Sequence, residues 1–270
     1  MMTTARQTPL GLLTLLLLGC GPTKAPVDIE EMLTYGFVQY DERFDRSLQE
    51  LGENLIPWVN QNFEEAEAGY TVGALTADHL AAVGIDRTLE AGIVGAVIGI
   101  DYDISMDTFA WALAHPNQTE IFPAYLEAER TTEDDLDCFR SRECEWFRAH
   151  DVLHTSLVES LGWEAWSEMD VNLRWLTLDD GTPVIAHWNF VPDPITLNTD
   201  LFEINQQYAF TYSWEREDGQ VRRAQAIWVD GQVLVDDVAE DFMLSVGITG
   251  IIAAAGDLEA WGQAQEAAAE

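Results

Sequence analysis

Apolar residues in the first third of the chain recur with a helical period. From Phe44 to Phe63 they are spaced by three and four residues, which is typical of an amphipathic helix. Gly52 and Pro57 interrupt this run, so we expect either a kink or two helices there. The pattern therefore predicts that this part of the chain is helical.

Two capping signals extend the helical part on either side. Asp28, with a glutamate three residues later, has the form of a capping box and predicts a helix start. Thr76 is placed to cap a short helix from Ala77 to Val83, after a break at Gly69 to Gly73. We therefore expect residues 28–91 to form a helical N-terminal part.

The chain changes character about a third of the way along. Residues from Ile93 to Ile100 are β-branched and rich in glycine, and alternation continues to Ile104, which predicts a buried strand. Ser105 then has the position of an N-cap for a helix that ends near His115-Pro116. We take this change as the start of an α+β domain, residues 92–270.

The middle of the chain carries mixed signals. Residues 121–130 fit either a helix or a strand. Thr132 is followed by three acidic residues, which are favourable near the positive end of a helix dipole and mark a helix start. We therefore expect residues 133–161 to be mostly helical.

From Trp163 onward the apolar period becomes two. Three Asp-Gly pairs separate the alternating segments, and each is a hairpin signal. They are Asp180-Gly181, Asp218-Gly219 and Asp230-Gly231. A helix is expected from about Val238 to Trp261. The predicted fold class is α+β: N-terminal helices, then an antiparallel meander packed against helices that include a long C-terminal one.

The order of these elements is itself informative. A strand, then helices, a meander and a long C-terminal helix over residues 93–261 resembles the helix-grip arrangement of START-like lipid-binding domains. The resemblance implies a pocket for an apolar ligand. Aromatic residues of the predicted sheet could line such a pocket, for an apolar ligand or a sugar, or could form the core face that packs on helices. They are Trp175, Trp188, Tyr208, Phe210, Tyr212, Trp214 and Trp228.

The N-terminal segment has the anatomy of an export signal. An apolar run from Leu10 to Leu18 follows Arg6, and it is shorter than the about 20 apolar residues that span a bilayer. Leu17-Leu18-Gly19-Cys20 resembles the lipobox of bacterial lipoproteins. The resemblance implies a signal peptide over residues 1–19, acylation of Cys20, for example with palmitate, and a lipidated tether over residues 20–27. The alternative is an ordinary secretory signal in which Cys20 is incidental.

The lipobox also indicates an address. Gly21 follows the cysteine, where lipoproteins kept at the inner membrane often have Asp. The resemblance therefore implies an exported, lipid-anchored protein, at the outer membrane if the host is Gram-negative.

Composition limits the partners further. The chain of 270 residues is 47% hydrophobic, enough for a sizeable core, but it carries 48 acidic against 13 basic residues and a net charge of −35. Such a field repels nucleic acid, so nucleic-acid binding is excluded. The acids are spread along the chain, which favours a solvated shell over an acidic tail.

Two cysteines remain after Cys20. Cys138 and Cys144 stand six residues apart, and in an exported chain such a pair predicts one local disulfide. The alternatives are two free thiols or a weak metal site.

A short histidine motif is the strongest metal candidate. On the predicted helix, His150 and His154 would lie four residues apart on one face, able to share a Zn²⁺. The segment resembles the zincin motif with Asp151 in place of the general-base glutamate. The third ligand would come from Glu159, Glu164 or Glu168. The alternative is two surface or half-buried histidines beside acidic residues.

An alternating acidic segment resembles half of a calcium loop. Asp101, Asp103, Ser105 and Asp107 follow the first half of an EF-hand pattern, but Met stands at the sixth position and Ala at the twelfth. A strand end followed by a helix cap explains these residues better.

Common catalytic motifs are missing from the sequence. It contains neither a phosphate-binding glycine loop nor Gly-x-Ser-x-Gly, and Lys24 is its only lysine. We therefore expect a non-catalytic envelope lipoprotein without a cofactor. Its partners would be the membrane, through the anchor, and an envelope protein or small apolar ligand. The alternatives are a START-like apolar-ligand binder and a metal-dependent hydrolase using His150 and His154.

Overall fold

The computed structural model describes residues 24–41, 45–87, 89, 93–191, 193–234 and 242–269. The predicted signal peptide, Cys20 and residues 21–23 of the predicted tether lie outside these residues. None of the described helices is both long enough and apolar enough to span a membrane.

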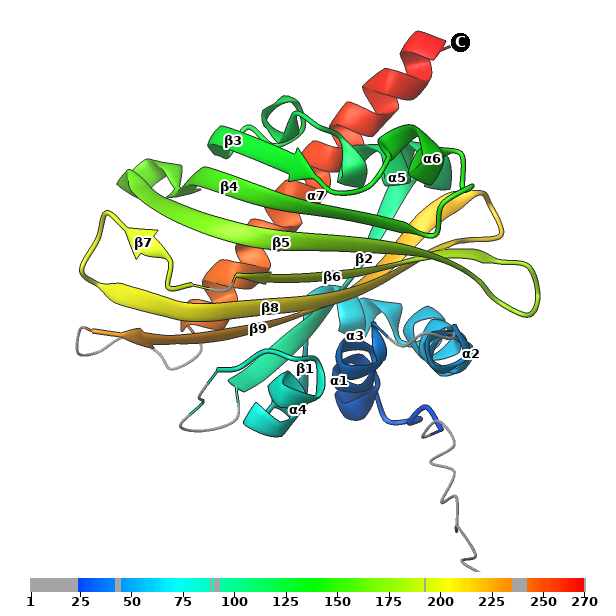
Figure 1. The fold of residues 1–270 in the computed structure, drawn as a ribbon, viewed down its shortest axis with the longest axis horizontal. Coiled ribbons are helices and arrows are strands. Elements are labelled where there is room, and N and C mark those ends of the chain that lie inside the picture. Colours follow the sequence, from blue (N-terminus) through cyan, green and yellow to red (C-terminus); the bar gives the residue numbers. More distant parts are fainter. Residues whose placement is uncertain are drawn as a thin grey trace, which may run out of the picture.

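One antiparallel sheet dominates the described chain (Figure 1). Its strand order is β1-β2-β9-β8-β6-β5-β4-β3, and the short β7 pairs with β5. The strands are β1 (Tyr70–Leu75), β2 (Ile93–Ser105), β3 (Tyr125–Thr132), β4 (Trp146–Val158), β5 (Trp163–Thr177), β6 (Pro183–Val191), β7 (Thr196–Leu197), β8 (Phe202–Glu215) and β9 (Gln220–Val233).

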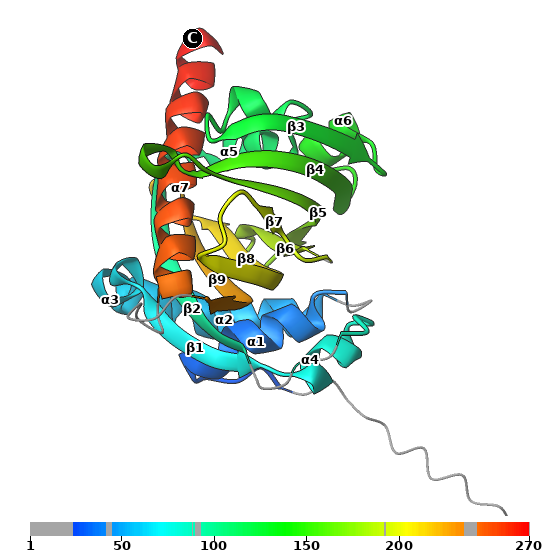
Figure 2. The same ribbon diagram turned by 90° about the vertical axis from the view of Figure 1, so that its left-hand side faces the viewer.

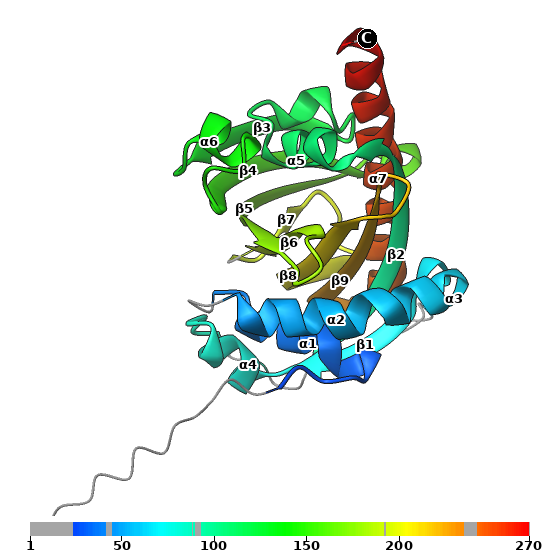
Figure 3. The same cartoon turned by 90° about the vertical axis from the view of Figure 1, so that its right-hand side faces the viewer.

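Helices lie on both faces of this sheet. They are α1 (Ile29–Gln39), α2 (Arg46–Gln61), α3 (Phe63–Ala68), α4 (Ala77–Ala82), α5 (Met106–Ala114), α6 (Leu136–Arg140) and α7 (Phe242–Ala269), with 3₁₀ turns η1 (Gln118–Glu120) and η2 (Glu159–Leu161). Figures 1 and 2 show α7 running along one face, next to α5. Figure 3 shows α1 and α2 next to each other on the opposite face of the sheet, below β8 and β9. The predicted α+β class, with a long C-terminal helix on an antiparallel sheet, is confirmed.

Side-chain alternation along the strands builds a separate core on each face. The α7 face carries Tyr102, Leu173, Trp175, Ile185 and Val221, which pack with side chains of α5 and α7. The α1 face carries Val184, Phe210, Tyr212, Trp214 and Trp228, which pack with α1 and α2. Because both faces are covered, the central strands are buried on both sides.

The two halves of α7 are held differently. In its second half Leu258 is buried, and Glu259 Oε1 accepts the Asp103 backbone N–H at 2.7 Å. Glu266 Oε1 accepts both the backbone N–H and the hydroxyl of Ser105. From Ser245 to Ala254, by contrast, no side chain is buried, although several are apolar.

Several local predictions are confirmed. β2 ends at Ser105, whose hydroxyl accepts the Thr108 N–H at 3.3 Å and caps α5. Thr76 and His79 form a capping box at the start of α4. A disulfide joins Cys138 and Cys144.

The predicted helix over residues 133–161 is wrong. Only α6 and η2 are helical there, and residues 146–158 form strand β4. The alternation of Phe147, Ala149, Asp151 and Leu153 was disguised by a charged residue at a buried position. Asp151 tolerates burial because Arg130 pairs with it through two bonds of 2.7 Å.

The helical part does break at Gly69, where α3 ends, but the residues that follow form strand β1. Gly73 lets the strand approach α1 closely, since a Cβ there would collide with the Glu30 carbonyl oxygen. The Gly73 carbonyl accepts the indole N–H of Trp228 at 3.0 Å. This glycine therefore serves close packing within a strand.

Two other glycine signals mark close contacts rather than turns. The turn predicted at Asp230-Gly231 is wrong, because β9 continues to Val233 with Gly231 opposite Ile204 of β8. α2 continues unbroken through Gly52 and Pro57. Gly52 leaves room for the hydroxyl of Tyr212.

Candidate functional site

Most of the aromatic residues nominated above are core residues. Tyr208, Phe210, Tyr212, Trp214 and Trp228 are buried on the α1 face. Trp175 is buried on the α7 face, where its indole donates to the Phe139 carbonyl at 3.0 Å. Only Trp188 is half-buried.

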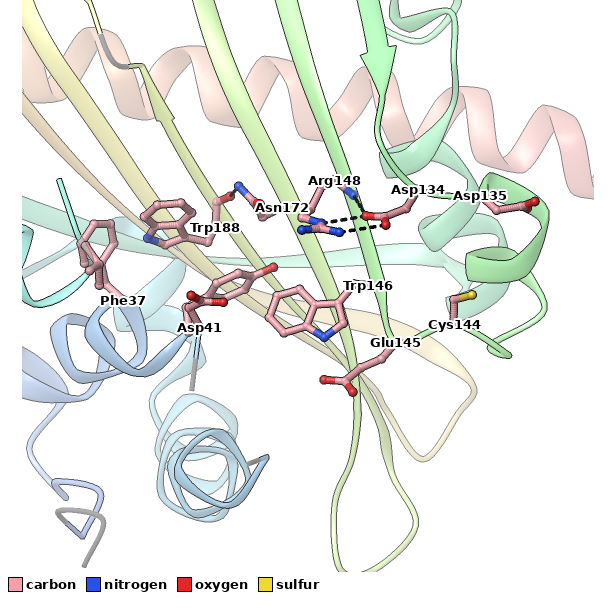
Figure 4. A pocket seen from close by; sticks show the side chains of 12 residues that line it. Phe37, Asp41, Asp134, Asp135, Cys144, Glu145, Trp146, Arg148, Asn172 and Trp188 are labelled. Atoms are coloured by element: carbon pink, nitrogen blue, oxygen red, sulfur yellow. Dashed lines mark hydrogen bonds and ion pairs between the residues drawn. The ribbon is translucent and has the colours of Figure 1, made fainter. Parts of the chain in front are cut away.

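Trp188 lines a pocket of about 640 Å³ where the end of α1 meets the sheet (Figure 4). We call this the α1–β6 pocket. It is lined by Phe37, Tyr40, Asp41, Val83, Asp134, Asp135, Cys144, Glu145, Trp146, Arg148, Asn172 and Trp188. These residues come from the end of α1, the residue after α4, the β3–β4 connection and strands β4 to β6, so the fold alone assembles the pocket.

Aromatic rings form its fixed wall. The rings of Tyr40 and Trp188 are stacked, with centroids 5.8 Å apart and an interplanar angle of 15°. Trp146 meets Tyr40 edge-on at 5.5 Å, and Phe37 supports Trp188 at 5.6 Å. Tyr40 and Phe37 are buried, so packing holds these rings in place before any ligand arrives.

Arg174 lies behind the wall and joins its parts. Its guanidinium donates to the Tyr40 carbonyl at 3.0 Å and to carboxylates of Glu145 and Asp45 at 2.5 Å each. It also sits 4.5 Å from the centroid of the Trp146 ring. With only 1% of its side chain exposed, Arg174 fixes the aromatic wall from below.

The charge at the pocket is mostly negative. Four carboxylates line it, of Asp41, Asp134, Asp135 and Glu145, against the single guanidinium of Arg148. Arg148 grips Asp134 through two bonds of 2.9 and 3.0 Å, which lowers the pKa of that carboxyl. The local field therefore disfavours an anionic ligand.

The polar groups of the pocket are suited to binding rather than reaction. Asp134 holds Arg148, Glu145 holds Arg174, and Asp135 caps α6 at the Cys138 N–H. Burial raises the pKa of the Tyr40 phenol well above its usual value, so this hydroxyl stays protonated. What is left to meet a ligand is mainly aromatic surface.

The histidine motif lies on β4, not on a helix. Four residues of strand span about 13 Å, so the imidazoles of His150 and His154 cannot share a metal ion. His150 Nδ1 instead contacts Asp170 at 2.8 Å, and His154 Nε2 contacts Glu164 at 2.9 Å. His150 also lies 3.5 Å from Glu168, while Glu159 begins η2. The predicted zinc arrangement therefore does not form, and no group of three or more possible ligands occurs among the described residues.

The EF-hand-like acids serve structural contacts. Asp101 binds Arg222 at 2.6 Å and Arg216 at 2.7 Å, and Asp103 accepts from Gln220. Asp107 pairs with Arg142 across the surface. These side chains fix the end of β2 and the start of α5.

Sequence reasoning missed most of the pocket. Phe37 in α1 and Tyr40, the capping residue at its end, stand three residues apart, which places them on one helix face. Their partners on the sheet are far away in sequence. Arg174 reaches Tyr40 across 134 residues. Trp188 alone had a local signal, because it belongs to an alternating strand.

No model of a known protein family matches the chain, and no curated protein matches its sequence. Several solved structures are weakly similar. A STAR-related lipid transfer protein from Xanthomonas axonopodis has 14% identity and a TM-score of 0.41, covering 64% of this chain and 90% of its own. The human StAR-related lipid transfer protein 5 has 7% identity and a TM-score of 0.38, with coverage of 83% and 100%.

A third similar structure is an enzyme. The Zhui aromatase/cyclase from a Streptomyces species has 10% identity and a TM-score of 0.39, covering 63% of this chain and 93% of its own. At TM-scores this low, what these proteins bind or catalyse implies nothing for this chain.

Proposed function

We propose that the protein is a non-catalytic binding protein that holds a small organic ligand in the α1–β6 pocket. The ligand is uncharged or cationic and presents an apolar ring or chain. The observation that carries this proposal is the pre-formed aromatic wall of Tyr40, Trp146 and Trp188 around a space of about 640 Å³.

The physical support is preorganisation. Binding loses affinity when side chains must be ordered, and here Arg174 and the α1 core have already fixed the rings. The acidic surroundings disfavour anions, while ring faces attract both apolar groups and cations. A ligand can therefore replace water on the aromatic surface with little rearrangement.

Titration with N-phenyl-1-naphthylamine, an uncharged aromatic probe that fluoresces in apolar surroundings, tests the proposal. Trp146→Ala is expected to weaken binding about fivefold or more, because it removes one aromatic wall. Trp188→Phe, which keeps a ring and the core packing, is expected to weaken binding less.

Trp166→Ala is the matched control. Trp166 lies on β5, is 39% exposed and stacks on His154 outside the pocket, so its loss should leave probe binding unchanged. Equal affinity in the wild type and Trp146→Ala, or equal losses in Trp146→Ala and Trp166→Ala, would contradict the pocket assignment.

We also propose that Cys20 is acylated and tethers this binding domain to a membrane. The support is the lipobox-like Leu17-Leu18-Gly19-Cys20 after a short apolar run. Intact mass spectrometry of the protein made in a bacterial host should show cleavage before Cys20 and added acyl chains. Cys20→Ser should abolish both, and an unmodified Cys20 in the wild type would refute the anchor.

A further inference from the structure

Three arginine side chains are buried in the described chain, and they differ in their partners. Arg130 forms two hydrogen bonds with the carboxylate of Asp151, and Arg174 contacts two carboxylates. Arg223, with 7% of its surface exposed, has no carboxylate oxygen within 4.0 Å among the described residues. A buried charge without a counter-charge is costly, so Arg223 calls for an explanation.

The contacts that Arg223 makes are long and neutral. Its Nη2 lies 3.4 Å from both the Thr211 hydroxyl and His187 Nδ1. Its Nη1 lies 3.4 Å from the Tyr102 hydroxyl, and its Nε has no partner in the described structure. These distances exceed the usual range for N–H···O bonds, so the guanidinium is incompletely satisfied.

Other unsatisfied polar atoms lie on the same face of the sheet as this guanidinium. Strands β6, β8 and β9 are adjacent, with His187 opposite Thr211 and Ser213 opposite Arg223. Within the described structure His187 Nε2, Asn189 Oδ1 and Ser213 Oγ are buried without a hydrogen-bond partner. We call these five residues the polar row: His187, Asn189, Thr211, Ser213 and Arg223. Native cores rarely leave so many groups unpaired together.

The polar row lies on the α7 face, beside apolar surface. The ring of Phe109 on α5 is 5.8 Å from the Arg223 guanidinium. Ile227, four residues along β9 on the same face, meets α7 at Gly247. The first half of α7 carries apolar side chains such as Ile248 and Ile251 that remain only half-buried. Along β9 the α7 face thus leads from the unsatisfied guanidinium of Arg223 to a contact with the incompletely buried half of α7 at Ile227.

We propose that the polar row binds the carboxylate of an amphipathic organic anion, whose apolar chain lies between the sheet and the first half of α7. A guanidinium fork matches a carboxylate with two parallel bonds, and the hydroxyl of Ser213 supplies another donor. This site lies on the opposite face of the sheet from the α1–β6 pocket and does not depend on it.

The histidine is suited to the same ligand. Burial lowers the pKa of His187 well below its usual value, and the positive charges of Arg223 and Arg130 lower it further. The ring is therefore neutral. When Nδ1 accepts from Arg223, Nε2 carries the proton and becomes a donor for the anion.

Equilibrium dialysis of the purified protein with radiolabelled dodecanoate tests the proposal. The wild type is expected to bind one dodecanoate, and Arg223→Met to weaken binding by about tenfold or more, since charge-assisted hydrogen bonds are lost. Arg223→Lys keeps the positive charge but lacks the forked guanidinium, so its affinity for dodecanoate should lie between those of the wild type and Arg223→Met. Unlabelled dodecyltrimethylammonium, which has the same chain with a positive head, should not displace the label.

Arg222→Met is the matched control. Arg222 is the next residue on β9 but serves the opposite face, where it binds Asp101. Its substitution should leave dodecanoate affinity within about twofold of the wild type. Equal losses in Arg222→Met and Arg223→Met, or no dodecanoate binding by the wild type, would overturn the proposal.

A stability measurement keeps the test decisive. Without ligand, Arg223→Met is expected to raise the melting temperature, by about 2–4 °C, because an unpaired buried charge is removed. A lowered melting temperature would show that Arg223 is already satisfied and would overturn the proposal. Arg223→Met should bind N-phenyl-1-naphthylamine like the wild type, so failure of either site is seen separately.

Discussion

Arg174 shows how one residue can join distant parts of this chain. Its hydrogen bonds to Tyr40, Asp45 and Glu145 connect the end of α1, the residue before α2 and the β3–β4 connection to β5. Arg223 occupies the opposite face of the sheet without such partners. An arginine side chain therefore links distant segments at position 174 and is incompletely hydrogen-bonded at position 223. The difference comes from the neighbouring residues.

His187 gives a pH dependence at the same scale. Its pKa is lowered in the folded state, so on acidification the unfolded chain takes up a proton near pH 6.5 before the folded chain does. The free energy of unfolding should therefore fall as pH drops below 6.5, by up to about 1.4 kcal/mol per pH unit. The loss ends once pH passes the folded-state pKa.

Urea unfolding of the wild type and His187→Gln between about pH 5 and pH 8 measures this effect. The free energy of unfolding of the variant should lack the pH dependence that His187 contributes. The free energy of unfolding of the wild type, relative to that of the variant, should therefore decrease as pH falls. Parallel pH profiles for the two proteins would show that His187 does not titrate differently on folding.

Among the helices and strands, α7 has two halves that differ in burial and in hydrogen bonding to the rest of the protein. Its second half is clamped by Glu259 and Glu266 and buries Leu258, while residues 245–254 bury no side chain. Local opening is easiest where few apolar contacts are lost. The helix is therefore expected to be stable at one end and easily opened at the other.

Hydrogen exchange read by mass spectrometry tests this difference. Amides of residues 245–254 should exchange faster than those of residues 255–262, and dodecanoate should slow the first group selectively. Glu266→Gln should speed exchange in the second half, because the clamp on Ser105 is weakened. Uniform protection along α7 would contradict this description.

For the whole molecule, the sequence predicted architecture better than sites. The period of two after Trp163 gave the meander, and the caps at Asp28 and Ser105 gave helix starts, because these signals are local. β4 was missed because Asp151 is buried with a partner on another strand. The glycines at 73 and 231 were misread because their reason is close contact with distant backbone.

The candidate sites were mostly beyond sequence reasoning. The α1–β6 pocket depends on α1 meeting strands more than a hundred residues away, and neither Tyr40 nor Trp146 carries a local signal of that meeting. The polar row depends on three strands in register. Trp188 could be nominated from alternation alone, although alternation does not separate a pocket residue from a core residue.

Two consecutive residues of β6 belong to different candidate sites on opposite faces of the sheet. His187 lies on the α7 face of the sheet, next to Arg223, and Trp188 lines the α1–β6 pocket. Inserting or deleting one residue before this pair would turn the strand over, presenting an imidazole to the aromatic wall and an indole to Arg223. The length of the chain before this pair is therefore constrained to change by even numbers of residues. A change of two residues leaves each side chain on its face of the sheet, and a change of one moves each to the opposite face.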